Sequence, residues 1–234
     1  MEKNLKYYSE ITYSILNCET QYLSNKKIIY QLFFESNTSN FRNIINNRIV
    51  HIDSYYSTQM SKRLYGIDDL VDELTFYSDE FLKVQTKEFL RNPTEMGIIN
   101  SLLEKNYGIN KSGKPFGKSI SLISKYLHFL TSGNFPIYDR LVIDSYKFLE
   151  KKNLILTTTS INNVNYFECI KKVNLSTGIN NYEKLDNLFW LIGKIRNNSF
   201  ASLLNKRDYL KLIKIKELDF DLKKNKKTSK SKKR

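Results

Sequence analysis

Apolar side chains recur three or four residues apart along most of the chain, and polar residues fill the positions between them. On a helix, this spacing gathers the apolar positions on one face. The pattern predicts helices at 5–16, 19–35, 40–60, 67–76, 78–90, 94–105, 118–130, 139–151, 164–173, 182–196 and 202–215. The fold is therefore expected to be mainly α, a multi-helix globular domain.

Two of the helix boundaries carry recognisable end signals. Ser78 can cap the helix that follows it, because its side-chain oxygen can accept a hydrogen bond from an unpaired backbone N–H group. Asn92-Pro93-Thr94 is expected to end one helix and open the next, since proline cannot continue the hydrogen-bond ladder.

One stretch favours extended structure over a helix. Residues 154–160 are rich in β-branched side chains, and Asn162-Asn163 can form a turn before a conceivable return strand at 165–168. At most one small β-hairpin is predicted. No glycine-rich loop joins a strand to a helix, which disfavours Rossmann and P-loop folds.

Glycine and proline gather in one place in the middle of the chain. Gly108, Gly113, Pro115 and Gly117 fall within ten residues, between two predicted helices. Such residues favour turns. We expect a loop at 110–117 that forms a helix-hairpin-helix-like element with its flanking helices.

The composition indicates a large core and a separate tail. With 234 residues, 41% of them hydrophobic, residues 1–221 can form one helical globular domain or two helical lobes. Residues 222–234 are Lys-rich and are expected to be disordered. No apolar run is long enough to cross a bilayer, and the N-terminus lacks the apolar core of a secretory signal, so we expect a cytoplasmic protein.

The net charge of +14 suggests nucleic acid as the partner. Eight Lys or Arg residues lie in 222–234 without any acidic residue, and subtracting these eight leaves +6 for the rest of the chain. A flexible polycation gains affinity for phosphates by releasing counterions. A coding sequence rich in A and T would also enrich Lys, so the tail is equally compatible with a solvated appendage.

Cysteine and histidine are too few for a structural metal site or a disulfide framework. The chain contains only Cys18, Cys169, His51 and His128. Two isolated thiols are best explained as reduced core residues. We expect no metal site and no cofactor.

The predicted helix at 118–130 carries the side chains with the clearest chemical potential. Ser121, Ser124, Lys125 and His128 stand at offsets 0, 3, 4 and 7, which places them in one polar stripe on an otherwise apolar helix. The stripe faces either solvent or a pocket. After Phe135-Pro136, Asp139 begins the next helix, where it can cap the helix or take part in a site.

This arrangement resembles the helix-hairpin-helix DNA glycosylase superfamily, the group of 8-oxoguanine glycosylases and endonuclease III. The resemblance covers about residues 113–142: a glycine-containing loop, a helix with Lys, a Phe-Pro turn and an Asp at the start of the next helix. It implies that 113–117 binds the DNA backbone, that a Lys is the nucleophile and that Asp139 assists departure of the base. Lys118 matches the nucleophile by its place after glycine, and Lys125 by its burial and its stripe.

The resemblance implies an enzyme that rotates a nucleotide out of duplex DNA and cleaves its N-glycosidic bond. Separately, we expect the protein to be a monomer. The catalytic candidates are Asp139, Lys125 and Lys118. The candidate nucleic-acid contacts are Gly113, Lys114, Gly117, Ser121, Ser124, His128, Tyr138 and Arg140, and the candidate walls for an extruded base are Tyr55, Tyr56, Tyr126, Tyr138 and Trp190.

Three alternatives stay open on the sequence alone. Without a Lys nucleophile, Asp139 could still act with water in a monofunctional glycosylase. The same loop and tail could belong to a non-catalytic helical module that binds DNA or RNA. The chain could also be a helical interaction protein whose basic charge comes from codon bias.

Overall fold

The protein is mainly α-helical, as the apolar spacing predicts. The computed structural model describes residues 5–16, 21–34, 40–93, 95, 97–155 and 160–196. Its helices are α1 (Leu5–Leu16), α2 (Gln21–Phe34), α3 (Phe41–Tyr56), α4 (Gly66–Thr75), α5 (Asp79–Arg91), α6 (Ile98–Glu104), α7 (Ile120–Leu130), α8 (Arg140–Lys151), α9 (Tyr166–Ser176) and α10 (Tyr182–Arg196), with a short 3-10 turn at Met60–Lys62. The predicted helix at 202–215 and the tail at 222–234 lie outside the described residues.

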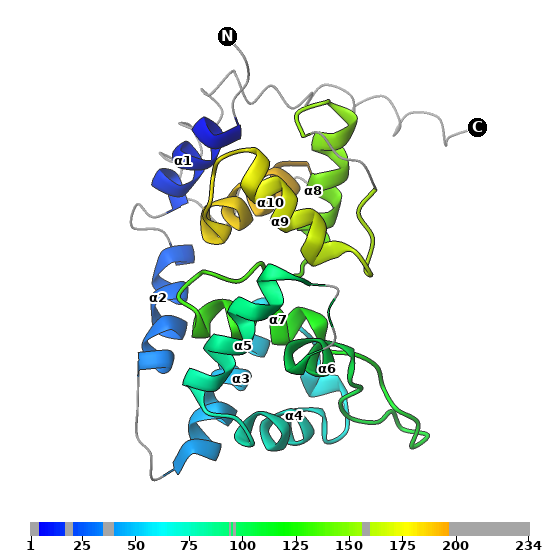
Figure 1. Ribbon diagram of the computed structural model, residues 1–234. Coiled ribbons are helices and arrows are strands. Elements are labelled where there is room, and N and C mark those ends of the chain that lie inside the picture. The colour runs from blue at the N-terminus through cyan, green and yellow to red at the C-terminus, as the bar shows by residue number, and fades with distance from the viewer. Residues whose placement is uncertain are drawn as a thin grey trace, which may run out of the picture.

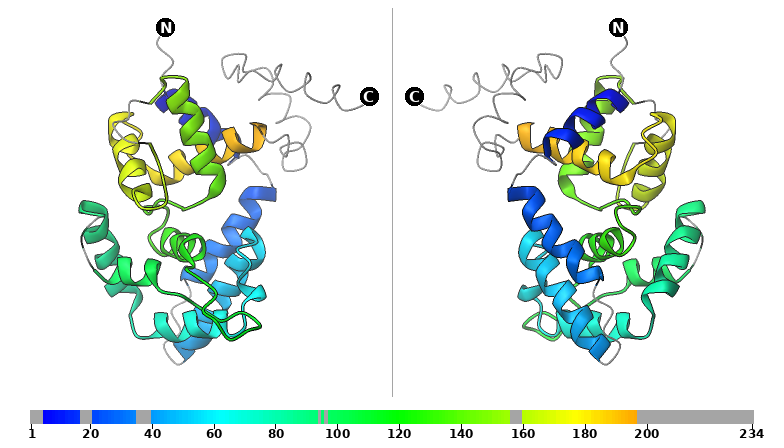
Figure 2. Two further views of the ribbon diagram at one scale, coloured as in Figure 1. Left: turned by 90° about the vertical axis from the view of Figure 1, so that its right-hand side faces the viewer. Right: turned by 90° about the vertical axis from the view of Figure 1, so that its left-hand side faces the viewer.

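The helices form two groups, each around its own apolar core (Figures 1 and 2). Helices α2 to α7 make the larger lobe, and its core residues include Ile49, Leu74 and Leu127. Helices α1, α8, α9 and α10 make the smaller lobe, where Leu149 and Phe189 are buried. The chain passes from one lobe to the other between α1 and α2 and again between α7 and α8, so α1 packs against α10 and its Leu5 is part of the core of the smaller lobe.

Several helix ends match the sequence signals. Ser78 caps α5, since its Oγ accepts a hydrogen bond from the Phe81 amide at 3.2 Å. Pro93 does follow the end of α5, and α6 begins at Ile98, after Gly97 in an extended conformation; Thr94, where the sequence opens this helix, lies outside the described residues. Among the helices described, none combines the length and apolar character that crossing a bilayer requires.

The helix predicted at 164–173 is confirmed as α9, and the alternative return strand at 165–168 is wrong. Residues from Tyr166 onward form α9, whose buried side chains Tyr166, Cys169, Ile170 and Val173 repeat at helical spacing. Residues 154–155 form a bend, and 156–159 lie outside the described residues. Burial of one helical face in the smaller lobe therefore outweighs the local preference for a hairpin.

The β-pairing that the described residues do show lies in the loop between α6 and α7. Isolated antiparallel bridges join Asn106 to Lys118 and Ile109 to Pro115, and a third joins Ile109 to Leu64. The loop therefore folds back on itself and pairs along one side with the chain between the 3-10 turn and α4. We call residues 106–118 the hairpin. It projects from the larger lobe (Figure 1).

Candidate functional site

Lys125 and Asp139 meet where the two lobes join. Lys125 stands in the middle of α7 in the larger lobe, and Asp139 is the N-cap residue of α8 in the smaller lobe. The Lys125 Nζ atom lies 3.6 Å from Oδ2 of Asp139. The other carboxylate oxygen, Oδ1, accepts the amide of Leu141 at 2.7 Å. Asp139 thus caps its helix with one oxygen and faces the amine with the other.

The Lys125 amine is almost completely enclosed. Its side chain is 1% exposed, whereas that of Asp139 is 29% exposed. Nζ donates a hydrogen bond to Oγ of Ser121 at 2.7 Å and lies 5.1 Å from the centre of the Tyr56 ring. Burial lowers the pKa of Lys125, and the charges of Asp139 and Asp186 oppose that change. The site therefore favours the neutral amine more than water does.

The rest of the α7 stripe holds the segment that leads to Asp139. Ser124 Oγ accepts the amide of Tyr138 at 2.9 Å, and His128 Nδ1 lies 2.7 Å from the carbonyl oxygen of Phe135. Burial lowers the pKa of His128 to about 3, so the ring is neutral and its Nδ1–H donates this bond. Ser124 and His128 are both fully buried. The stripe faces the lobe junction, and these two residues position the connecting segment.

Further charged side chains from α2 and α10 lie close to this pair. Lys26 Nζ lies 2.6 Å from Oε1 of Glu183, and the Lys26 side chain is 3% exposed. Asp186 lies three residues after Glu183 on α10, on the same face of the helix, and interacts electrostatically with Lys26, Lys125 and Asp139. Burial raises the pKa of Asp186 to about 7, even though the residue keeps some contact with solvent. We call Lys26, Lys125, Asp139, Glu183 and Asp186 the junction cluster.

Opposite pKa shifts of His128 and Asp186 predict a specific pH dependence. Between about pH 3 and 6.5 the unfolded chain protonates His128 and the fold does not, so stability falls as pH falls. Between about pH 4 and 7 the folded chain keeps a proton on Asp186 that the unfolded chain releases, so stability rises as pH falls. The two effects offset each other in the native protein.

Replacing Asp186 with Asn is therefore expected to expose the His128 effect. From pH 6.5 to 4, the free energy of unfolding of Asp186→Asn should fall more steeply than that of the native protein, by up to about 1.4 kcal/mol per pH unit. Urea titrations at several pH values measure it. Parallel pH profiles for the two proteins would contradict the assignment of a raised pKa to Asp186, and His128→Gln should flatten the variant's profile.

The other sequence candidates lie away from this junction. Lys118 Nζ pairs with Glu104 and is half exposed, so the structure does not bring it to Asp139. Gly113 and Lys114 are exposed at the tip of the hairpin, and Gly117 is partly exposed near its base. Arg140 is exposed at the start of α8.

Some of the aromatic candidates lie at the Lys125–Asp139 pair, and others lie away from it. Tyr56 borders Lys125, and Tyr138 is partly exposed beside Asp139, with its hydroxyl donating to Oδ1 of Asn163 at 2.7 Å. Tyr126 is fully buried against Arg48 and cannot line a pocket in this structure. Trp190 lies on α10 with the Lys194 amine 5.4 Å from its ring.

Sequence reasoning missed Lys26, Glu183 and Asp186. Each stands in a segment that reads as an amphipathic helix, where charged residues are expected to face solvent. A weak signal was present at Asp186, which interrupts the apolar positions of the stretch 185–195. Only the packing of α2 and α10 at the lobe junction shows that these charges face inward.

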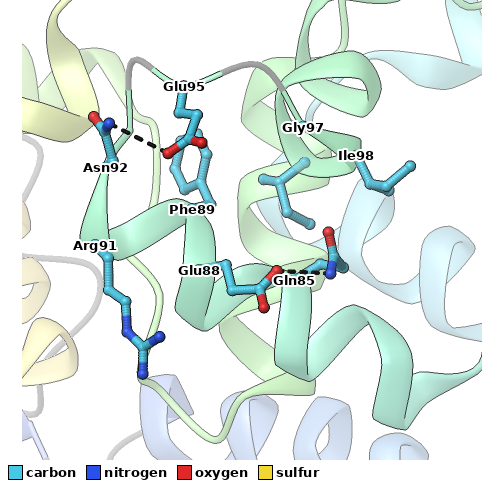
Figure 3. A pocket seen from close by; sticks show the side chains of 9 residues that line it. Gln85, Glu88, Phe89, Arg91, Asn92, Glu95, Gly97 and Ile98 are labelled. Atoms are coloured by element: carbon cyan, nitrogen blue, oxygen red, sulfur yellow. Dashed lines mark hydrogen bonds between the residues drawn. The ribbon is translucent and has the colours of Figure 1, made fainter.

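A hollow of about 320 Å³ lies elsewhere, between the end of α5 and the start of α6 (Figure 3). Glu88 accepts a hydrogen bond from Gln85 there at 2.8 Å, and Phe89 and Ile98 supply apolar walls. None of the candidate residues from the sequence lines this hollow. Gln85 bonds to Glu88 and Asn92 to Glu95 there, and the hollow lies away from the junction cluster, so we do not assign it that chemistry.

Comparison with protein family models, curated proteins and solved structures gives no match. Within the part of the chain that the structure describes, no three His, Cys, Asp or Glu side chains are arranged to hold a metal ion. Functional inference therefore starts from the junction cluster and the hairpin.

Proposed function

We propose that this protein binds DNA and cleaves the N-glycosidic bond of a nucleotide rotated out of the helix, in the manner of the helix-hairpin-helix DNA glycosylases that its sequence resembles. The observation that carries the proposal is the enclosed Lys125 amine, 3.6 Å from the Asp139 carboxylate at the junction of two lobes. Of the two candidate nucleophiles, Lys125, which the polar stripe favours, lies beside the assisting carboxylate, whereas Lys118, which matches the family by its place after glycine, pairs with Glu104 instead.

The chemistry requires a neutral amine beside a negative charge. The Lys125 lone pair would form a bond to C1′ of the sugar while the bond from C1′ to the base breaks, and the base leaves with that electron pair. Burial lowers the pKa of Lys125, which raises the share of neutral amine. The amine's excess proton passes to Asp139 or to water. Asp139 also stabilises the positive charge that develops on the sugar.

Access to the amine is expected from the side of Ser121 and Asp139. Both residues are partly exposed, whereas the rest of the Lys125 side chain is covered. An incoming sugar would displace the Ser121 hydroxyl from Nζ, and the partly exposed ring of Tyr138 stands beside the route. Binding energy from phosphate contacts along the hairpin would offset the cost of unstacking the nucleotide.

Borohydride trapping tests the proposal without knowledge of the base. A DNA duplex with an abasic site presents the sugar aldehyde directly, and reduction of the iminium links the reacting amine to DNA. We expect the native protein to form this adduct, Lys125→Met to lose it by more than a hundredfold, and Lys118→Ala to keep it. Asp139→Asn should then slow base release from duplexes with oxidised, deaminated or alkylated bases.

Melting curves of the variants provide the folding control. Lys125→Met keeps the length of the side chain, so its melting temperature shows whether a lost adduct reflects chemistry or unfolding. An adduct that survives Lys125→Met and disappears in Lys118→Ala would reverse the assignment of the nucleophile. If no protein forms an adduct or releases a base, the excision proposal fails.

The second candidate is a non-catalytic module that binds DNA or RNA. Lys111 and Lys114 at the exposed end of the hairpin favour it, because no ion pair involves either of them among the described residues. Binding with a steep salt dependence, without adduct or base release, would be its signature.

A further inference from the structure

The hairpin and the chain before α4 present large apolar side chains to solvent. Leu64 is 49% exposed, Tyr65 66% and Phe116 44%. Leu64 pairs with Ile109 through two backbone hydrogen bonds of 3.0 Å, and Ile109 pairs in turn with Pro115. In this register Gly108 lies between Tyr65 on one neighbouring strand segment and Phe116 on the other. The Phe116 amide also donates to the Gly108 carbonyl at 2.9 Å, so Tyr65 and Phe116 both flank this glycine, and we call the surface around these two rings the hairpin platform.

This surface is held firmly by Arg63. Its Nη1 donates to the carbonyl of Gly117 at 2.7 Å and to Oγ of Ser119 at 2.8 Å, and its Nη2 donates to the carbonyl of Lys118 at 3.0 Å. The guanidinium carbon lies 4.8 Å from the centre of the Phe116 ring. Arg63 thus fixes the base of the hairpin and supports the exposed ring.

Tyr65 adopts a conformation that a large side chain seldom tolerates. Its φ is +61°, in the left-handed region, at the N-cap of α4. Glycine would adopt this conformation without strain. A bulky aromatic residue kept in a strained turn and exposed to water suggests a role in binding, since folding alone favours a different residue.

The charges around the platform favour a polyanion. The hairpin carries Lys111, Lys114 and Lys118 and no acidic residue. Lys118 pairs with Glu104, whereas Lys111 and Lys114 take part in no ion pair among the described residues. Two acids stand in the first turn of α4: Asp68 is exposed, and the carboxylate of Asp69 accepts the Gly108 amide at 2.8 Å. Flat apolar rings beside free lysines match the alternating bases and phosphates of a nucleic acid strand.

We infer that the hairpin platform stacks unpaired bases of a single strand on Tyr65 and Phe116, while Lys111 and Lys114 hold the adjoining phosphates. This inference rests on the proposed function for the class of partner, and it specifies a strand whose bases are not already paired. Bases in an intact duplex are stacked on one another and would offer these rings only the sugar-phosphate backbone.

Fluorescence anisotropy with the full chain tests the platform. The probes are a labelled strand of twelve thymidines and a duplex of equal length. Tyr65→Gly and Phe116→Ala should each weaken single-strand binding about tenfold, which corresponds to one lost stacking contact. Duplex affinity should change less than twofold. Phe76→Ala, which removes an 81% exposed ring at the end of α4, is the matched control and should leave both affinities unchanged.

Two further readouts separate stacking from charge and from folding. The double variant Lys111→Ala/Lys114→Ala should reduce the slope of log affinity against log salt by about 1.4, whereas the aromatic variants keep the native slope. Because its left-handed strain is relieved, Tyr65→Gly should melt at the native temperature or above it. Aromatic variants that bind the single strand as the native protein does, or that weaken the duplex equally, would overturn the inference.

The platform and the excision proposal fail in different ways. In the Lys125→Met background, stacking on the single strand should persist although no adduct forms. If the aromatic variants weaken single-strand binding as expected but no adduct and no base release are found, the platform inference holds and the excision proposal fails. If an adduct forms but the aromatic variants bind the single strand with unchanged affinity, the excision proposal holds and the platform inference fails.

Discussion

Replacing Asp79 with Ala is expected to lower the free energy of unfolding by about 3–5 kcal/mol, because it leaves the Arg48 guanidinium buried without a counter-charge. Arg48 on α3 is 1% exposed, and its Nη1 lies 2.9 and 3.0 Å from the two carboxylate oxygens of Asp79. Its Nε donates to the carbonyl of Leu32 at 3.0 Å. These contacts tie together α2, α3 and the start of α5.

Asp72 provides a matched control for this variant. Its carboxylate also accepts two hydrogen bonds from one arginine, Arg42, at 2.7 and 3.0 Å, but the two side chains are more than half exposed. Water replaces the partner there, so Asp72→Ala should cost less than about 1 kcal/mol. Thermal melting should show a drop of about 10 °C for Asp79→Ala and little change for Asp72→Ala.

A further variant checks the cause of the Asp79 effect. Arg48→Met in the Asp79→Ala background removes the uncompensated charge and should recover part of the lost stability. If the double variant loses as much free energy of unfolding as the two single variants together, the loss comes from packing and not from the ion pair. Equal losses for Asp79→Ala and Asp72→Ala would contradict the argument from burial.

Replacing Gly108 with Ala is expected to cost about 3 kcal/mol and to detach the hairpin from the chain before α4. Gly108 has a φ of +74°, and an added Cβ would lie 2.8 Å from the Gly66 Cα and 2.9 Å from the Leu64 carbonyl oxygen. Both neighbours are backbone atoms, which cannot move without breaking the pairing of Leu64 with Ile109. Left-handed strain and steric overlap therefore add at one position.

Gly113 separates these two contributions. Its φ is +75°, almost the same, but an added Cβ would meet no atom within 4 Å. Gly113→Ala should therefore cost only the left-handed strain, about 1 kcal/mol. Urea denaturation measures the difference between the two variants, which reports the steric contact alone. Equal losses would show that the hairpin yields at Gly108 and does not pack rigidly there.

The helices were predictable because local periodicity and tertiary burial agree in this chain. α1 and α10 have the bounds that the apolar spacing predicts, 5–16 and 182–196. Asp139 was predictable as a cap, since a short carboxylate suits an unpaired helix N-terminus. After Asn162 the sequence leaves a helix at 164–173 and a return strand at 165–168 both open, and burial of one face in the smaller lobe makes residues 166–176 helical.

The same reasoning from local sequence could predict part of the candidate site. Offsets of 0, 3, 4 and 7 placed Ser121, Ser124, Lys125 and His128 on one stripe, and the structure has this stripe. Whether it faced solvent or the interior depended on which helices cover it. The segment that leads from α7 to Asp139 bonds to Ser124, Lys125 and His128, all of which are buried, and so settles that question.

By itself, the sequence determined the mainly helical fold, the turn-rich hairpin and the cap at Asp139, because each depends on residues close together in the chain. Only the tertiary structure decided that Lys125, and not Lys118, lies beside Asp139, and that Lys26 and Asp186 join them. Those charges come from opposite ends of the chain. Their proximity, and the burial that shifts the pKa values of Lys125 and Asp186, arise from the packing of segments far apart in the chain, which no local pattern encodes.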